Sequence, residues 1–386
     1  MALGSWLFAL CSLPFALRPS PLALMFSHLI GNDEVKDSLR RLLATGRATG
    51  SLLFTGEEGI GKKLFALELA KAFNCRNRIG ADNQTKDQRP KTQVLTLDSC
   101  SECSSCKRIA RSAFAPFGKD DDDKNRLIWS EHMDVAMVRP YKNIIRVPVM
   151  RELESEANFR PFEGAARVFI IEDADYMNDQ AANALLKTLE EPPPTTHLIL
   201  TTSNPTALLP TIRSRCQVIR FAPIPHDQIE KFLIEKEAMP AADAKLLART
   251  SRGSLGRALA TDIESYRERR EAMLAVLTAL ALTGDRARLL RSAEDLAAAK
   301  DRDSYEQQLD VLESLIRDAW SLALGRPQEM LVNSDLLKPL QSIAAELISK
   351  KAMSWLSQIE ELRGALEVNL NRRIASDALF VSMAMA

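Results

Sequence analysis

The stretch Gly56–Lys63, GEEGIGKK, follows the short apolar run Leu52–Phe54 and precedes the helical pattern Leu64–Ala70. A strand, a glycine-rich turn and a helix in that order form a phosphate cradle, because glycine allows the left-handed turn and the helix N-terminus adds positive potential. The residues that we expect to surround a nucleotide here are Gly56, Gly59, Gly61, Lys62 and Lys63.

The loop matches the pattern G-x-x-x-x-G-K-[ST] up to its last position. Lys62 stands where its ammonium reaches the outer phosphates, but Lys63 replaces the serine or threonine whose hydroxyl binds Mg²⁺. The sequence therefore predicts a nucleotide pocket that lacks one metal ligand, and binding of ATP and Mg²⁺ by this chain itself is left open.

Length and composition indicate a soluble protein of two or three domains. The chain has 386 residues, of which 26% are charged and 46% hydrophobic, and its net charge is zero. Because no overall field attracts nucleic acid or an anionic membrane, any contact with DNA must be local or shared with partners.

Residues 1–24 are apolar, but Pro14, Pro19 and Pro21 interrupt them and no basic residue precedes the run. A secretory signal needs a basic start, and a membrane span needs about 18 apolar residues without breakers. We therefore expect residues 1–25 to be a leader outside the folded protein, Met25 to be the true start, and the protein to be cytoplasmic.

From Phe26 to about residue 222, apolar runs alternate with helical patterns, which is typical of a parallel α/β sheet. A polar segment at about 74–132 interrupts the alternation and reads as an insertion. The sequence predicts five parallel strands, at Leu52–Thr55, Val135–Val138, Val168–Ile171, Leu198–Thr202 and Val218–Phe221.

The remainder of the chain has helical spacing. Pro223 and Pro225 mark the exit from the last strand. We expect a small helical domain at 223–265 and a large helical domain at 266–386, after the α/β domain at 26–222.

Polar groups follow two of the expected strands. Glu172 and Asp173 end one strand, at the place where a P-loop protein holds Mg²⁺ and polarises water. Their order is the reverse of the active Asp-Glu pattern, and adjacent strand residues point to opposite faces. Asn204 follows the next strand and is placed to sense a γ-phosphate. The alternatives, acids that merely end a strand and an asparagine that makes a turn, remain open.

Four cysteines fall in or beside the insertion. Cys100, Cys103 and Cys106 are each separated by two intervening residues, and Cys75 lies about 25 positions before Cys100. Four thiolates suit a tetrahedral structural zinc site, whereas disulfides are disfavoured in a reducing compartment. We predict structural Zn²⁺ on these four residues, with Cys75 the least certain ligand.

The order of these motifs resembles the AAA+ clamp-loader subunits of bacterial DNA polymerase III, from Phe26 to the C-terminus. The motifs that carry the resemblance are Leu29–Gly31, the phosphate loop, the acid-ended strand, Glu190–Pro193, Asn204, Ser214–Cys216 and Gly253–Arg257. The resemblance implies an AAA+ P-loop domain with an inserted zinc module, a helical lid and a helical collar.

Within that family the chain looks like the delta prime type, which keeps the fold and often loses ATP hydrolysis. The lysine at Lys63 and the order Glu172-Asp173 favour this type over the motor (tau/gamma) subunits, and Leu366–Arg373 resembles the end of its collar. The resemblance implies a subunit that enters a hetero-oligomeric ring with motor and delta subunits and helps to load the sliding clamp on primed DNA.

The resemblance also implies roles for two arginines. Arg215 would reach across the subunit boundary as an arginine finger to ATP on the neighbouring motor subunit, and Arg257 would face this chain's own pocket as a second sensor. Without the resemblance, Arg215 reads as an ordinary surface charge.

Two other functions are weighed. An active clamp-loader ATPase would have to tolerate Lys63, and a zinc-dependent DNA-binding protein is disfavoured by zero net charge and by the lack of basic and aromatic residues around the cysteines. The large helical region also suits an independent domain that packs only on its own core.

Overall fold

The computed structural model describes residues 26, 28–44, 50–77, 99–111, 127–366 and 371–385. The expected leader, residues 1–25, and parts of the expected insertion lie outside these described residues. Two compact units make up the chain, the first ending at Pro225 and the second running from His226 to Ala386.

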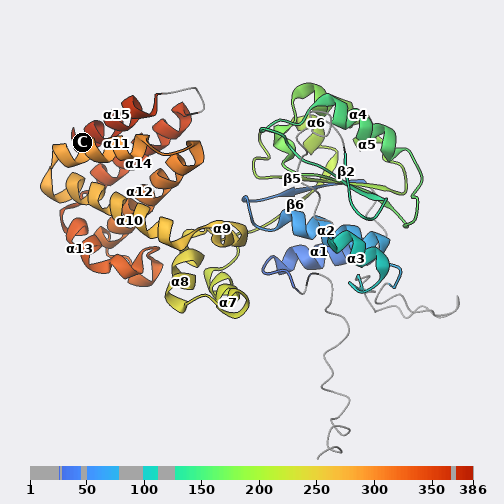
Figure 1. Ribbon diagram of the computed structural model, residues 1–386, viewed down its shortest axis with the longest axis horizontal. Coiled ribbons are helices and arrows are strands. Elements are labelled where there is room, and N and C mark those ends of the chain that lie inside the picture. The colour runs from blue at the N-terminus through green and yellow to red at the C-terminus, as the bar shows by residue number, and fades with distance from the viewer. Residues whose placement is uncertain are drawn as a thin grey trace, which may run out of the picture. The chain divides into compact units, whose positions relative to one another are not determined.

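The first unit is built on a six-stranded sheet in the order β2-β3-β4-β5-β1-β6 (Figure 1). Every neighbouring pair is parallel except β2 and β3. The strands are β1 (Gly50–Thr55), β2 (Ile128–Trp129), β3 (Val135–Val138), β4 (Arg167–Ile171), β5 (Thr196–Thr202) and β6 (Cys216–Arg220).

The prediction of a sheet with five parallel strands was wrong in one respect. The five predicted strands are present, but β2 adds a sixth, antiparallel strand, in which Ile128 pairs with Met137 and Trp129 pairs with Ala136. A two-residue strand is too short to show an alternating pattern, and β2 lies in the segment that we had assigned to the insertion.

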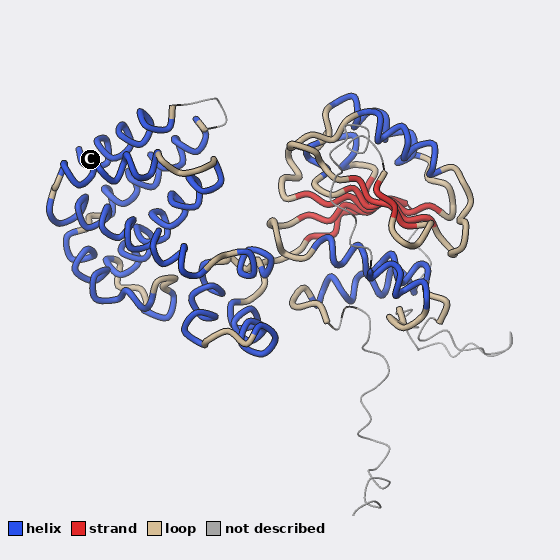
Figure 2. Tube along the Cα trace, in the orientation of Figure 1, coloured by secondary structure: helices blue, strands red, loops and turns tan. Residues whose placement is uncertain are grey.

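Helices cover both faces of the sheet, as Figure 2 shows. On one face lie α1 (Asp33–Ala44), α2 (Lys62–Asn74) and α3 (Ser104–Arg111), and on the other lie α4 (Val147–Ala157), α5 (Asp179–Glu190) and α6 (Pro210–Arg213). Because helices cover both faces of the inner strands, these strands are largely apolar without alternation, and all five residues of β4 are buried, whereas the edge strand β6 has exposed residues.

Aromatic rings pack together on one of these faces, beside the glycine-rich loop. Phe65 of α2 stacks on Phe26 with ring centroids 5.1 Å apart and meets the edge of Phe221 at 5.0 Å. Phe54 of β1 lies 5.2 Å from Phe221. Burial of such large rings is strongly favourable, so the strand and helix on either side of the loop are held firmly.

All regular elements described in the second unit are helices. They are α7 (His226–Glu237), α8 (Ala241–Thr250), α9 (Leu255–Ala260), α10 (Ile263–Thr278), which continues as a π-turn at Ala279–Thr283, α11 (Arg286–Ala297), α12 (Arg302–Ala323), α13 (Leu337–Glu346), α14 (Ser349–Ala365) and α15 (Arg372–Met385), with short 3₁₀ turns at Gln328–Met330 and Ser334–Leu336. Within the described chain, none is long and apolar enough to cross a membrane.

Aspartates fix where three of these helices begin. The side chains of Asp262, Asp285 and Asp301 each accept a hydrogen bond from the backbone N–H three residues later, at the first turns of α10, α11 and α12. Such caps satisfy donors that a helix leaves open. The core beneath includes Tyr305 of α12 and Trp355 of α14, both fully buried.

Candidate functional site

The glycine-rich loop joins β1 to α2. Gly56, Gly59 and Gly61 have φ angles of 151°, 72° and 104°, which other residues rarely adopt. A Cβ atom at Gly56 would lie 2.8 Å from the carbonyl oxygen of Phe221. The loop therefore needs glycine, and it leads into the N-terminus of α2 as a phosphate cradle does.

Lys62, the first residue of α2, lies inside this loop. Its Nζ donates to the carbonyl oxygens of Gly56 at 2.7 Å and Glu57 at 2.8 Å. Burial lowers the pKa of Lys62, and the negative charge of Asp173 is the largest effect that opposes the shift. The ammonium thus binds the chain's own loop.

Lys63 points toward the end of β4, where Glu172 lies. The Lys63 Nζ is 3.0 Å from Glu172 Oε2, and Nε of Arg139, just beyond β3, is 3.2 Å from the same oxygen. Lys63 has no hydroxyl to offer a metal ion, and two cations of this chain neutralise the carboxylate that would organise one. Sequence reasoning missed Arg139, which no motif marks.

Asp173 and Asp175 follow Glu172 at the same sheet edge. Asp173 is in the left-handed region with φ 47°. Burial, and then the charges of Glu172 and Asp175, raise the pKa of Asp173 to about 6. Asp175 Oδ1 accepts a 2.6 Å hydrogen bond from Thr202 of β5, so β4 and β5 are joined where both strands end.

Asn204 lies two residues beyond β5 and is exposed. Its Oδ1 accepts a 2.6 Å hydrogen bond from Thr206 Oγ1, and its backbone N–H donates to Thr202 Oγ1 at 3.0 Å. These bonds are those of a turn residue. The register that pairs Thr55 with Thr202 nevertheless brings this turn and the glycine-rich loop to one edge of the sheet.

Arg215 lies between α6 and β6 and is exposed. Its Nη2 is 2.5 Å from Glu190 Oε1 at the end of α5, and its Nη1 donates to the Thr211 carbonyl oxygen at 3.0 Å. A carboxylate at a helix C-terminus is unfavourable to the helix dipole, and the guanidinium offsets that cost. The motif containing Glu190 is visible in the sequence, but this contact is not.

Arg257 belongs to the second unit, on α9. The helix begins at the Ser254 side chain, whose oxygen accepts a 3.2 Å hydrogen bond from the Arg257 N–H. The Arg257 side chain is half-buried. Its expected role toward the pocket stays a prediction.

The four cysteines converge, Cys75 included. The Sγ atoms of Cys75, Cys100, Cys103 and Cys106 all lie within 4.8 Å of one another. Tetrahedral zinc with Zn–S bonds of about 2.3 Å separates its sulfurs by about 3.8 Å, so the set fits such an ion.

Backbone donors contact two sulfurs of the cluster. The N–H of Cys100 donates to Cys75 Sγ at 3.3 Å, and the N–H of Cys103 donates to Cys100 Sγ at 3.2 Å. Burial by itself raises the pKa of Cys103, but backbone N–H groups of Cys106 and Arg76 lower it to about 6, whereas burial raises the pKa of Cys75 and of Cys106. Four sulfur donors match a thiophilic metal ion.

The fold and the site together define a P-loop α/β protein with a helical C-terminal region and a four-cysteine cluster. Residues 31–225 match the family described as DNA polymerase III, delta subunit, and residues 267–379 match DNA polymerase III, delta subunit, C terminal. The chain belongs to the DNA polymerase III delta subunit family.

Individual relatives agree with this assignment. The chain is 28% identical to DNA polymerase III subunit delta' of Bacillus subtilis over 325 residues, covering 84% of this chain and 88% of the relative. It is 29% identical to subunit delta' of Escherichia coli over 324 residues, covering 83% and 84%. The predicted resemblance to the delta prime type is confirmed.

The chain is also homologous to tau and gamma subunits of DNA polymerase III, over a shorter region. It is 29% identical to DNA polymerase III subunit tau of Escherichia coli over 239 residues, which is 61% of this chain and 32% of the relative. This chain thus spans about a third of the length of tau, compared with most of the length of delta'.

Proposed function

We propose that this chain is a non-motor, delta prime-like subunit of a bacterial DNA polymerase III clamp loader. In this proposal it enters a hetero-oligomeric ring with motor (tau/gamma) and delta subunits, and the ring loads the sliding clamp on primed DNA. The protein acts in the cytoplasm. The similarity to two delta' subunits over more than four fifths of the chain supports the proposal.

The pairing of Lys63 with Glu172 is the observation that carries the non-motor role. A motor site needs a hydroxyl and a carboxylate on Mg²⁺ to neutralise charge on the transferring phosphoryl group. Here an ammonium occupies the hydroxyl's place in the sequence and lies 3.0 Å from the carboxylate. ATP hydrolysis by this chain is therefore absent or weak.

Arg215 then acts in trans as the arginine finger. Negative charge develops on the phosphoryl oxygens in the transition state, and a guanidinium from a neighbouring subunit stabilises it. The exposure of Arg215 supports this role. Glu190 and Thr211 each bind one nitrogen of its guanidinium. These contacts already restrict the side chain before it meets ATP, so binding costs less side-chain conformational entropy.

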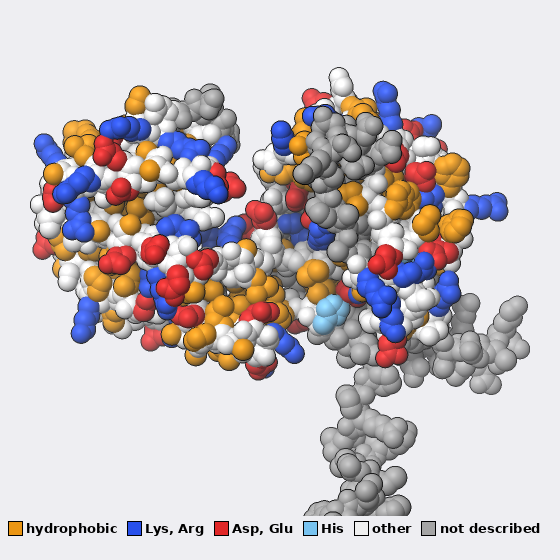
Figure 3. Space-filling model, viewed as in Figure 1, with side chains coloured by type: hydrophobic (Ala, Val, Ile, Leu, Met, Phe, Trp, Pro, Cys, Tyr) orange, Lys and Arg blue, Asp and Glu red, His pale blue; other side chains and the backbone are white. Residues whose placement is uncertain are grey.

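The rest of the chain serves the assembly. We assign residues 26–222 to the AAA+ P-loop domain, 223–265 to the lid, which carries Arg257 as the expected second sensor, and 266–386 to the collar. The cysteine cluster holds structural Zn²⁺. On the face in Figure 3, acidic and basic side chains are intermixed, and the net charge is zero, so this chain reaches primed DNA through the complex.

A second candidate is an active clamp-loader ATPase. The intact glycines and Lys62 of the loop favour it, as does the similarity to tau. In that case the isolated chain binds and hydrolyses ATP in a Mg²⁺-dependent manner, whereas the first proposal expects little turnover by this chain alone.

Reconstitution tests the first proposal. Motor and delta subunits from the same organism are mixed with clamp and primed DNA, with or without this chain, and clamp loading and DNA-stimulated ATP turnover are measured. We expect both activities to need this chain. Full loading in its absence would contradict the proposed role, and rapid Mg²⁺-dependent turnover by the chain alone would favour the second candidate.

A further inference from the structure

The segment 158–166 connects α4 to β4 and displays two phenylalanines. Phe162 is 79% exposed, more than any other large hydrophobic side chain of the described residues, and Phe159 is 57% exposed. A connection with such exposed rings would be expected to move freely. Its backbone is instead held at several consecutive residues.

Asp134, which directly precedes β3, makes the first set of contacts with this segment. Its fully buried carboxylate accepts hydrogen bonds from the N–H groups of Phe162 at 2.6 Å, Glu163 at 2.8 Å and Gly164 at 2.7 Å. Three donors satisfy a buried carboxylate well. This hold is anchored in the sheet.

Asn74, the last residue of α2, makes the second hold. Its Oδ1 accepts from the N–H groups of Ala165 and Ala166, both at 3.0 Å. A Cβ atom on Gly164 would lie 2.1 Å from this oxygen, so the segment passes very close to the asparagine. Asn74 directly precedes Cys75.

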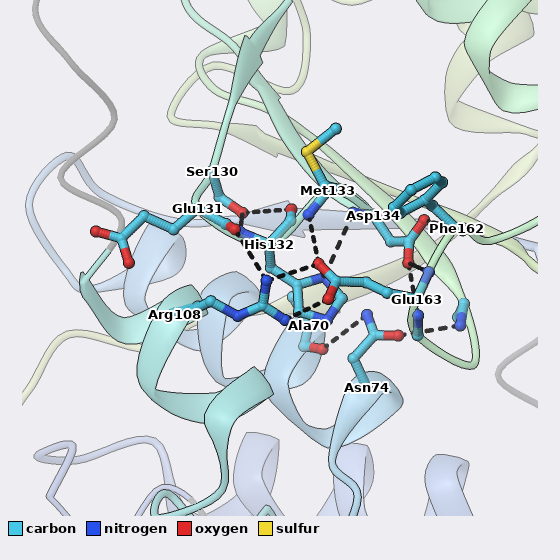
Figure 4. Close-up of polar contacts among 12 residues, drawn as sticks. Ala70, Asn74, Arg108, Ser130, Glu131, His132, Met133, Asp134, Phe162 and Glu163 are labelled. Atoms are coloured by element: carbon cyan, nitrogen blue, oxygen red, sulfur yellow. Dashed lines mark hydrogen bonds and ion pairs between the residues drawn. The ribbon is translucent and has the colours of Figure 1, made fainter.

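Arg108 of α3 makes the third hold. Figure 4 shows its guanidinium facing the carboxylate of Glu163. Nη1 donates to Oε1 at 2.9 Å, while Nη2 pairs with Oε2. The same Oε1 accepts the N–H of Met133 at 3.0 Å. Arg108 lies two residues after Cys106.

The contacts made by Asn74 and by Arg108 therefore come from α2 and α3, the two helices that the cysteine cluster joins. Cys75 follows α2, Cys106 lies within α3, and the two helices pack together. Removing the link leaves the contacts of Asp134 in place, because Asp134 directly precedes β3 and its carbonyl oxygen accepts a hydrogen bond from Val168 of β4. The contact between Arg108 and Glu163 depends on the position of α3.

We propose that the four-cysteine cluster, when it binds a thiophilic divalent ion, acts as a clamp that fixes residues 162–166 and with them the exposed Phe162. The ion sets the position of α3, α3 sets Arg108, and Arg108 holds Glu163. Loss of the ion loosens the segment without unfolding the sheet. This clamp rests on the proposed zinc site but is independent of any role in ATP hydrolysis.

Hydrogen exchange of the full chain tests the clamp. Amide exchange in peptides covering 158–166 is compared with zinc bound and after chelation, with metal content measured by elemental analysis. We expect exchange in this segment to accelerate about tenfold on metal loss, which is what one charged hydrogen bond is worth. Peptides from β5 should not change.

Two variants separate the arginine from the metal. Arg108→Ala should accelerate exchange in 158–166 while zinc stays bound, and Lys107→Ala, an exposed neighbour on the same helix, should not. Cys103→Ser should reproduce chelation.

Unchanged exchange in 158–166 after verified metal loss would overturn the proposal, as would a chain that binds no zinc when zinc is supplied. If Cys103→Ser fails to fold, chelation and Arg108→Ala still decide. Failure of the ATP-related role would leave these results unaffected.

Discussion

The glycine-rich loop and the Arg215 edge place cations in opposite situations within one unit. In the loop, the buried Lys62 binds loop carbonyls, and Lys63, whose side chain is 33% exposed, pairs with Glu172. The Arg215 side chain is 34% exposed and pairs with Glu190. The clear contrast is therefore between Lys62, which is buried and bound to its own loop, and Arg215, which lies at the surface and can reach an outside anion.

The test with the largest expected effect compares two substitutions in the assembled loader. Arg215→Ala should sharply reduce ATP turnover at the adjoining motor site, because a donated arginine is worth roughly 10³–10⁵ in rate in GTPases. A ring with several sites should show a smaller total loss. Lys62→Ala should change turnover far less.

The measurement is steady-state ATP hydrolysis at saturating clamp and primed DNA, after gel filtration shows that each variant still enters the complex. Equal, large losses from both substitutions would contradict the division between pocket and arginine. A normal rate for Arg215→Ala would contradict the finger itself.

A second test converts the pocket. Lys63→Thr supplies the missing hydroxyl and removes one cation from Glu172, so Mg²⁺-dependent ATP binding by the isolated chain should strengthen about tenfold, roughly 1.4 kcal/mol. Titration calorimetry with and without Mg²⁺ measures it. Lys63→Ala, which removes the cation without adding a ligand, is the control. If both variants gain equally, the lost hydroxyl is not the defect.

A third test concerns how Arg215 is held. Glu190→Gln should lower the turnover number of the loader by up to about fivefold, since an exposed ion pair contributes roughly 0.2–1 kcal/mol. The KM for ATP should stay the same, because the pair orients the guanidinium without contacting substrate. Glu191→Gln, at the adjacent exposed carboxylate, is the matched control. A faster loader would show that Glu190 restrains the arginine instead.

The smallest expected effect is a change in the stability of the first unit with pH. The pKa of Asp173 in the folded chain is about 6, above its ordinary value of 3.8. The folded state therefore holds this proton more tightly, and stability falls as pH rises from about 4 to 6. Asp173→Asn should stabilise the first unit at pH 7.5 by about 0.5 kcal/mol, after screening is allowed for, and less at pH 5. Thermal melting at the two pH values measures it; an equal gain at both would contradict a charge effect.

The sequence predicted what depends on local pattern. The buried strands are visible because helices on both faces leave β4 apolar after Arg167, and the glycines are visible because their φ angles exclude other residues. Cys75 was also predicted as a member of the cluster. Cysteine is rare enough that a fourth cysteine near a regularly spaced set of three indicates a shared site.

Contacts between distant residues were not predictable. Asp134 meets the N–H groups of segment 158–166, and Arg108 meets Glu163 across 55 positions. Each residue alone resembles an ordinary surface charge. The antiparallel β2 was missed for a related reason, because its two residues pair only after the turn that follows has formed. Such features are set by tertiary packing, which no local pattern records.

The place of β1 in the sheet bears on how the chain is made. β1 pairs with β5 and β6, and Ser51 meets Cys216 roughly 165 residues later. At ~5–20 residues per second, a ribosome needs on the order of ten seconds or more to deliver that partner. During synthesis, the apolar segment Leu52–Phe54 waits without its neighbouring strands, and it would be a substrate for chaperones that shield nascent chains.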